Sequence, residues 1–280
     1  MVPVRRVVGL VLAAGLAVGV VACVREPDDA PLPAGVEAHL DQSRVLRKTR
    51  TVFVRVHNGS GKDLTVEQFR LTSPRFEPVE WEGREVVGAG YDADLEVTLP
   101  VGRCGGALDA RLTVETRSDG EHRRSTLPLD DVYGAVTAIV DRDCAQVSVS
   151  EAATVEIDEV RIVGEGRDAV LELPVTFTPT GRRTDVALEG FGPTVLFTAA
   201  PDAPPVGEHL LAGTPFTVDL RLVPNRCDPH ALAEDKVGTL IPVLVSGRGL
   251  PDDASYFLPL GDRRRGAFFD YYAEACGLAP

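Results

Sequence analysis

The sequence of 280 residues predicts an all-β protein that contains two tandem antiparallel β-sandwich domains. Three observations lead to this prediction. Many short segments alternate apolar and polar residues, which is typical of strands with one buried face and one solvated face. Turn-forming residues separate these segments at short intervals, and the same order of strands and cysteines occurs twice along the chain.

The alternating segments are distributed over both halves of the chain. Thr51–Val56 and Asp94–Leu99 are clear examples, and Asn58-Gly59 after the first of them favours a tight turn because both residues tolerate positive φ. No long amphipathic helix is predicted, and His230–Lys236 is expected to form one or two helical turns at most. The expected strands are 51–56, 64–66, 94–99, 110–115, 135–140, 146–149, 154–162, 169–177, 217–222, 237–245, 256–260 and 267–272.

An internal repeat divides the chain into two copies of one pattern. Leu95–Cys104 aligns with Val218–Cys227, since both alternate over their first five residues and end in Arg-Cys. Downstream, Thr126–Asp131 aligns with Phe257–Asp262 through a shared Leu-Pro-Leu. The period of roughly 125 residues is far longer than that of solenoid repeats, so the pattern predicts two domains.

The two domains are predicted at residues 44–150 and 151–280. Their length and their number of short strands are typical of a sandwich fold, and in this pattern both resemble immunoglobulin-like and fibronectin-like domains. The resemblance implies two immunoglobulin-like antiparallel sandwiches in tandem. It does not extend to the antibody-type hallmark, because Trp81 precedes Cys104 and does not lie between paired cysteines.

The N-terminal segment has the parts of an export signal. Arg5 and Arg6 form a positive region, and Val7–Val21 is an uncharged run that is too short to cross a bilayer comfortably. The run leads into Val-Ala-Cys23, which resembles the lipobox of bacterial lipoproteins. The resemblance implies a signal peptide at residues 1–22 and a diacylated Cys23 as the first mature residue. Two acyl chains are sufficient for stable membrane anchoring.

Residues 23–43 are predicted to form a disordered tether that begins with the lipidated cysteine. The segment is rich in proline and aspartate and has no apolar period, and such segments stay extended. A tether of this kind holds the folded domains away from the membrane, although a junction without any role has the same composition. Removal of residues 1–22 takes away two arginines and no acid, so the net charge falls from −13 to −15.

Four cysteines remain when Cys23 is lipidated, and an even number in an exported chain favours disulfide bonds. No Cys-x-x-Cys occurs, so neither a thioredoxin-like redox site nor a zinc ribbon is indicated. Four cysteines allow three pairings, and spacing alone does not choose among them. The duplication selects Cys104–Cys144 and Cys227–Cys276, with one bond in each domain.

The sequence contains no recognisable motif for catalysis or metal binding. A Gly-x-Ser-x-Gly elbow, a Gly-rich phosphate loop and His-Glu-x-x-His are absent, and the five histidines are not spaced as metal ligands. Paired aspartates such as Asp130-Asp131 are expected to be solvated turn residues and not calcium ligands. Arg263–Arg265 is taken as the one basic cluster and is expected at a hairpin tip, with contact to an acidic or phosphate-bearing partner as the alternative. No catalytic residue, metal site or cofactor is predicted.

Charge and composition restrict the source and the partners. A net charge of −13 argues against nucleic acid as a ligand, since phosphate contacts require surplus cations. Lysine accounts for three residues and arginine for 26, and this bias, together with abundant Ala, Gly and Val, resembles proteins of an actinobacterial type.

The sequence therefore predicts a lipid-anchored protein on the extracytoplasmic face of the bacterial cell membrane. We expect a non-enzymatic binding or adaptor module whose partner is an envelope protein or a glycan. Two alternatives stay open. An enzyme or enzyme accessory subunit would place clustered acids and histidines at the domain junction, and a binder of small ligands or ions would contain a large apolar pocket.

The anchor prediction is tested by Cys23→Ser. Without the cysteine no acyl chain is attached, so we expect the protein to move from the membrane fraction to the soluble fraction. Cell fractionation followed by immunoblotting measures this shift, with the unmodified chain as the reference. Unchanged retention in the membrane fraction would contradict anchoring through Cys23.

Overall fold

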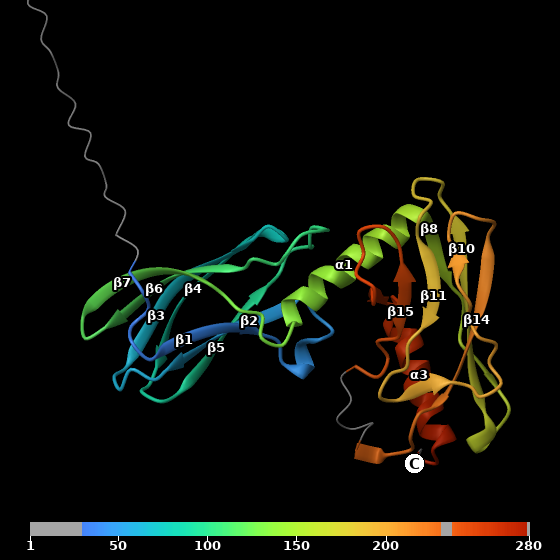
Figure 1. The fold of residues 1–280 in the computed structure, drawn as a ribbon. Helices are drawn as coiled ribbons and strands as arrows, with labels where there is room; N and C mark the ends of the chain where they lie inside the picture. Colours follow the sequence, from blue (N-terminus) through green and yellow to red (C-terminus); the bar gives the residue numbers. More distant parts are fainter. Residues whose placement is uncertain (1–29, 231–236, 279–280) are drawn as a thin grey trace, which may run out of the picture.

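The structure is a computed structural model that describes residues 30–230 and 237–278. The described residues form four antiparallel sheets and two long helices, which confirms the all-β prediction for the fold class. Figure 1 shows two β lobes that lie side by side and are joined by helix α1 (Ala135–Ala152). The predicted signal peptide, Cys23, the start of the tether and nearly all of the helical turns expected at 230–236 lie outside the described residues.

Lobe 1, residues 30–134, consists of two facing sheets around one apolar core. The core contains Leu40, Val54, Phe69, Phe76 and Leu112, which are all at most 3% exposed. One sheet has the order β1 (Val36–Asp41), β2 (Thr51–Asn58), β5 (Asp92–Thr98), and the other has the order β4 (Phe76–Val87), β3 (Leu64–Ser73), β6 (Arg111–Ser118), β7 (Glu121–Pro128). A 3-10 turn, η1 (Arg44–Leu46), connects β1 to β2.

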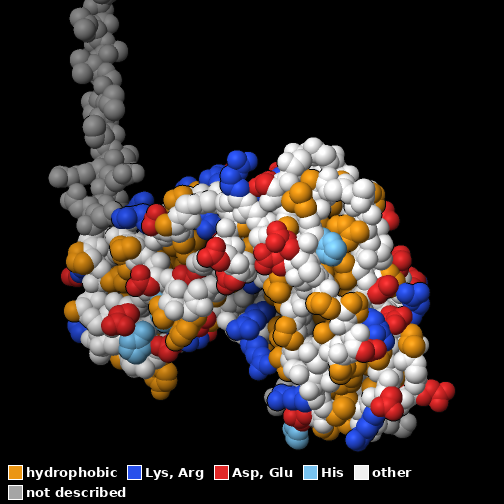
Figure 2. Space-filling model, turned by 45° about the vertical axis from the view of Figure 1, so that its right-hand side comes forward, with side chains coloured by type: hydrophobic (Ala, Val, Ile, Leu, Met, Phe, Trp, Pro, Cys, Tyr) orange, Lys and Arg blue, Asp and Glu red, His pale blue; other side chains and the backbone are white. Residues whose placement is uncertain are grey.

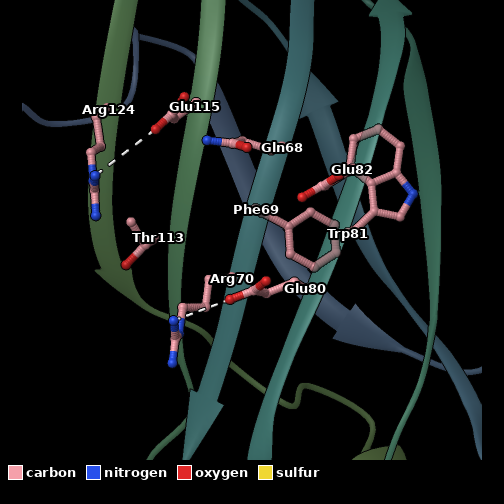
Figure 3. Close-up of a pocket in the computed structure, with 9 residues that line it drawn as sticks. All are labelled: Gln68, Phe69, Arg70, Glu80, Trp81, Glu82, Thr113, Glu115 and Arg124. Carbon is pink, nitrogen blue, oxygen red and sulfur yellow. Dashed lines mark hydrogen bonds and ion pairs between the residues drawn. The ribbon is translucent and has the colours of Figure 1, made fainter.

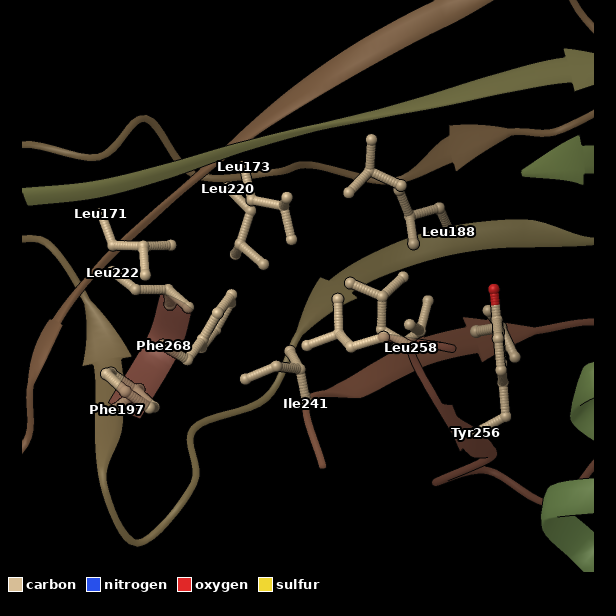
Figure 4. Packing of buried hydrophobic residues seen from close by; sticks show 14 of the residues in the cluster. Leu171, Leu173, Leu188, Phe197, Leu220, Leu222, Ile241, Tyr256, Leu258 and Phe268 are labelled. Carbon is tan, nitrogen blue, oxygen red and sulfur yellow. The ribbon is translucent and has the colours of Figure 1, made fainter. Parts of the chain in front are cut away.

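Lobe 2, residues 153–278, has a separate core. Figure 4 shows Leu171 and Leu173 of one strand beside Leu222 and Leu220 of the neighbouring strand, with the ring of Phe268 close to them. One sheet has the order β12 (Phe197–Ala199), β14 (Phe216–Pro224), β10 (Val170–Pro179), β8 (Ala153–Ile157), with β9 (Arg161–Val163) also on β10. The other has the order β13 (His209–Leu210), β11 (Ala187–Phe191), β15 (Pro242–Ser246), β16 (Ser255–Phe257), and a 3-10 turn, η2 (Gly166–Asp168), precedes β10.

The two lobes repeat one strand order. The path β1-β2-β5 of lobe 1 corresponds to β8-β10-β14 of lobe 2, and β3-β6-β7 corresponds to β11-β15-β16. A helix follows in both copies, α1 after the first and α3 (Asp262–Ala275) after the second. This correspondence supports the tandem duplication, while the assignment of both lobes to the immunoglobulin-like fold stays a prediction.

The structure contains both disulfide bonds that the duplication predicts. Cys104 joins Cys144 and Cys227 joins Cys276, with Cα atoms 5.3 and 5.1 Å apart. Cys104 and Cys227 lie in the loops that follow β5 and β14. Their partners lie in the helix that follows each repeat, Cys144 within α1 and Cys276 at the C-terminal end of α3. Disulfide bonds of this kind indicate an oxidising, extracytoplasmic compartment. Among the described residues, no helix has both the length and the apolar character needed to cross a bilayer.

The strands predicted at 135–140 and 146–149 are wrong, because both segments belong to helix α1. Val136, Ile139 and Val140 enter the core of lobe 1, whereas Ala145 and Val149 enter the core of lobe 2. At about 3.6 residues per turn these two sets lie on nearly opposite sides of the helix. The helix therefore has no single apolar stripe that would predict it from the sequence. The short alternation Gln-Val-Ser-Val has the pattern of a strand instead.

The strand predicted at 267–272 and the hairpin tip predicted at Arg263–Arg265 are also wrong. Both lie in helix α3, whose buried residues Phe268, Tyr271, Tyr272 and Ala275 recur with helical spacing. The composition of the aromatic run Phe-Phe-Asp-Tyr-Tyr favours a strand. The segment is nevertheless helical, because a helix packs these rings together against the core of lobe 2.

The tether is shorter than predicted, and lobe 1 begins before residue 44. Val36–Asp41 forms strand β1, which pairs antiparallel with β2 from Val36 opposite Asn58 to Asp41 opposite Phe53. Val36 and Leu40 are buried, and this spacing is that of one face of a strand. The boundary predicted at residue 150 falls inside α1, so one helix is shared by both lobes.

Arg183 attaches the C-terminal half of α1 to lobe 2. Its guanidinium donates to the Ser148 hydroxyl on α1 at 2.7 Å and to the carbonyl of Arg248 at 2.7 Å. Asp185 accepts from Arg183 at 2.9 Å and from the backbone N–H of Arg248 at 3.0 Å. The hydrogen bond from the Arg183 side chain, followed by that from the Arg248 backbone, lowers the pKa of Asp185 to about 2.

We expect Asp185→Asn to lower the melting temperature at neutral pH and to have less effect in acid. Because the folded-state pKa of Asp185 is lowered, its carboxylate stabilises the fold above its unfolded pKa, and this stabilisation is lost as the pH falls from about 4 to about 2. Thermal melts followed by circular dichroism measure the difference from the unchanged protein at each pH. Asp252→Asn at an exposed turn is the control, and a difference for Asp185→Asn that does not vary with pH would contradict the assignment.

Candidate functional site

A groove lies where the two lobes meet beside α1. Figure 2 shows Lys and Arg side chains gathered in the hollow between the lobes, on a protein whose net charge is −13. Two adjoining cavities of about 260 and 360 Å³ form this groove and share Arg47 and Phe257. We call it the junction groove, and its remaining lining residues are Lys48, Thr49, Arg50, Ile139, Arg142, Asp143, Gln146, Pro193, Thr194, Val195, Val237, Leu240 and Tyr256.

One wall of the groove is fixed by an ion pair between lobe 1 and α1. Arg50 donates to both carboxylate oxygens of Asp143, at 2.5 and 2.8 Å, and to the carbonyl of Leu99 at 2.8 Å. The second oxygen of Asp143 also accepts from the backbone N–H of Gly102 at 2.7 Å. A Cβ at residue 102 would lie 2.9 Å from the Cβ of Val140, so glycine permits this close approach to the helix.

The same region of α1 is held at a second point beside the groove. Cys144 forms its disulfide bond with Cys104, and Arg75 donates to Asp141 at 2.8 Å. Arg75 is a buried cation, so its pairing with Asp141 is required in that position. The predicted disulfide therefore lies next to the groove and helps to position its helical wall.

Arg142 forms a further contact between α1 and lobe 2. Its guanidinium carbon lies 4.9 Å from the centroid of the Phe257 ring, a distance typical of a cation–π contact. Burial lowers the pKa of Arg142, Asp143 raises it, and the neighbouring cations Arg47 and Arg50 lower it further. The groove thus concentrates like charges around a partly desolvated guanidinium.

Three groove cations have no carboxylate partner in the described part of the chain. Within residues 30–230 and 237–278, Arg47, Lys48 and Arg142 form no ion pair, whereas Arg50 is neutralised by Asp143. Arg47 and Lys48 are exposed at the groove mouth. The groove therefore carries uncompensated positive charge on an acidic protein, and an anion is the ligand that this charge favours.

The opposite end of the groove is apolar. It is lined by Pro193, Val195 and Leu240 of lobe 2 and by the ring of Phe257. In β16, Phe257 points to the junction while the neighbouring Tyr256 is buried in the lobe 2 core, as expected for adjacent residues of a strand. Burial raises the pKa of the Tyr256 hydroxyl, which has no hydrogen-bond partner among the described residues.

The sequence did not predict that Arg47, Lys48 and Arg142 would form a cationic site. Arg263–Arg265 is not the one basic cluster, because Arg44, Arg47, Lys48 and Arg50 lie within seven residues of each other. The segment lies between the predicted tether (23–43) and the first predicted strand (51–56), so neither prediction included it. Arg263 instead pairs with Glu159, and Arg264 donates to the backbone carbonyls of Asp158 and Ile157.

The residues that would indicate an enzyme at the junction lie elsewhere. None of the five histidines lines the junction groove. His57 pairs with Asp92 at 2.7 Å and His122 contacts Glu115 at 3.3 Å, both on lobe 1. In the described residues no group of three or more His, Cys, Asp or Glu side chains is arranged to hold a metal ion.

A second cavity lies on the outer face of the sheet β4-β3-β6-β7, shown in Figure 3. Each of its two arginines is paired with a glutamate. Arg70 pairs with Glu80 at 3.1 Å, and Arg124 lies 3.9 Å from Glu115. This sheet face is therefore less suited to an anionic ligand than the junction groove.

Comparison with known proteins does not identify a family. No protein-family model and no curated protein matches the sequence. Among solved structures, the chain is similar to red sea bream transglutaminase at 13% identity, with 81% of this chain and 32% of that chain covered and a TM-score of 0.23. The exo-chitosanase CsxA of Amycolatopsis orientalis has 16% identity, coverages of 80% and 26%, and a TM-score of 0.20.

A BSP domain of a biofilm-associated protein has 12% identity, coverages of 79% and 57%, and a TM-score of 0.20. The chain spans less than two thirds of the length of each of these three chains. Similarities at such TM-scores carry no argument about function, so the functional conclusion depends on the groove itself.

We expect Asp143→Asn to lower the free energy of unfolding by about 2 kcal/mol, because charge is removed from three hydrogen bonds that hold α1. Urea denaturation measures this loss. Asp94→Asn is the matched control, since Asp94 also pairs with an arginine but is 39% exposed, compared with 12% for Asp143. For this exposed pair we expect a loss of about 0–1 kcal/mol. Equal losses in the two variants would contradict the role of Asp143 at the junction.

Proposed function

We propose that the protein is a lipid-anchored module of the cell envelope that binds its ligand or partner in the junction groove without catalysing a reaction. The lipobox-like sequence at Cys23 supports the anchor. The two disulfide bonds support exposure to an oxidising compartment. The groove supports binding, because it brings together cations, an aromatic ring and apolar side chains from both lobes.

One observation carries this proposal: helix α1 belongs to both cores. Its first turns bury Val136, Ile139 and Val140 in lobe 1, and its last turns bury Ala145 and Val149 in lobe 2. The two walls of the groove are therefore held in one arrangement before a ligand arrives. A site that is already ordered loses less conformational entropy on binding, so it binds more tightly for the same contacts.

The proposal is tested by photocrosslinking in intact cells. A benzoylphenylalanine in place of Gln146, an exposed groove residue on α1, is expected to capture the natural ligand or partner. The same group in place of Val147, which is 39% exposed and is not a groove residue, is the matched control. Mass spectrometry of the adducts identifies what each position captures.

We expect a reproducible adduct that is specific to position 146. The same adducts from both positions would mean that capture is nonspecific. No adduct at position 146 above the background of irradiated cells without the photoreactive group would contradict the groove as the binding surface.

A further inference from the structure

The junction groove has two chemically different ends that meet at two shared residues. Arg47 and Phe257 line both of its cavities. On one side of them lie Lys48 and Arg142, and on the other side lie Val195 and Leu240. A ligand that fills the whole groove must therefore combine an anionic group with an apolar group.

The cationic end is better matched by phosphate than by carboxylate. Arg47, Lys48 and Arg142 are without ion pairs in the described residues, and a carboxylate neutralises only one unit of charge. A phosphate monoester carries a charge of about −1.5 to −2 and three strong acceptor oxygens. Planar guanidinium groups bind such oxygens in pairs, and an ammonium group adds a point charge.

The carboxylates near this end form their ion pairs with other arginines. Asp143 lines the groove, but it is bonded to Arg50 and to the backbone N–H of Gly102. Asp141 on the same helix is paired with Arg75. The two acids that flank Arg142 in sequence are therefore engaged with lobe 1, which leaves the guanidinium of Arg142 over Phe257.

We propose that the junction groove binds a phosphate ester that carries an apolar chain, with the phosphate among Arg47, Lys48 and Arg142 and the chain along Phe257, Val195 and Leu240. The proposal rests on the proposed function in one respect, that the groove is the binding surface. Two sources supply this chemistry: a phospholipid within a bilayer, and a phosphorylated amphiphile that is free in solution.

Calorimetric titration of the full chain carrying Cys23→Ser tests the ligand class. The probes are dihexanoyl phosphatidic acid, dihexanoylglycerol, which has the chains without the phosphate, and inorganic phosphate, which has no chain. We expect phosphatidic acid to bind more tightly than either of the other two. Reversal of two exposed charges with Arg47→Glu and Lys48→Glu is expected to weaken its binding by about tenfold or more.

The matched control reverses two exposed arginines outside the groove, Arg111→Glu and Arg167→Glu, which changes the net charge equally. Its affinity is expected to equal that of the unchanged chain. Equal weakening in the control would show a general charge effect and would overturn the site. Equal affinity for dihexanoylglycerol would overturn the role of the phosphate, and equal affinity for inorganic phosphate would overturn the role of the chain.

Cosedimentation with neutral vesicles, with and without phosphatidic acid, distinguishes the two sources. Phosphatidic-acid-dependent binding that is lost on reversal of Arg47 and Lys48 supports a bilayer lipid. Binding of the dihexanoyl lipid in solution, without binding to the vesicles, supports a free amphiphile. Absence of both, together with a protein adduct at position 146 in the crosslinking experiment, would overturn the ligand class and leave the binding module intact.

Discussion

The structure depends on one constraint: helix α1 has to bury opposite sides in two different cores. Val136, Ile139 and Val140 pack in lobe 1, and Ala145, Val149 and Ala152 pack in lobe 2. Each buried Val or Ile contributes about 1.5–3 kcal/mol. Rotation of the helix would expose three such side chains of lobe 1, or Val149 together with two alanines of lobe 2. The relative orientation of the lobes follows from this double burial, and so does the shape of the groove between them.

Polar contacts reinforce the constraint at defined points along the helix. Cys144 and Asp143 attach the middle of α1 to lobe 1, through a disulfide bond and through Arg50. Ser148, one turn later, is attached to lobe 2 through Arg183. Arg142 directly precedes these attachments and contacts Phe257 across the junction. The helical wall of the groove is therefore held at several points, while Arg47, Lys48, Val195 and Leu240 reach the groove from loops.

The sequence was sufficient for the features that depend on local alternation and on the repeat. Most lobe strands, the two-copy pattern and both disulfide pairs follow from residue order alone. The helices were missed for different reasons: α1 lacks a single apolar stripe because it serves two cores, and the aromatic run in α3 has the composition of a strand. The groove was not predictable, because Arg47, Arg142 and Phe257 meet only after the two lobes are placed by α1.

Because the protein as a whole is acidic, the cationic groove attracts an anion only at short range. A net charge of −13 repels an anion at long range, but charges separated by more than about 8 Å are largely screened at physiological ionic strength. Inside that distance Arg47, Lys48 and Arg142 dominate, and the apolar end adds attraction that salt does not screen. An anion without an apolar part is attracted only by the cations and gains nothing from the apolar end. The groove is therefore matched to amphiphilic anions that are presented close to it, and a protein held at a membrane encounters such ligands at high local concentration.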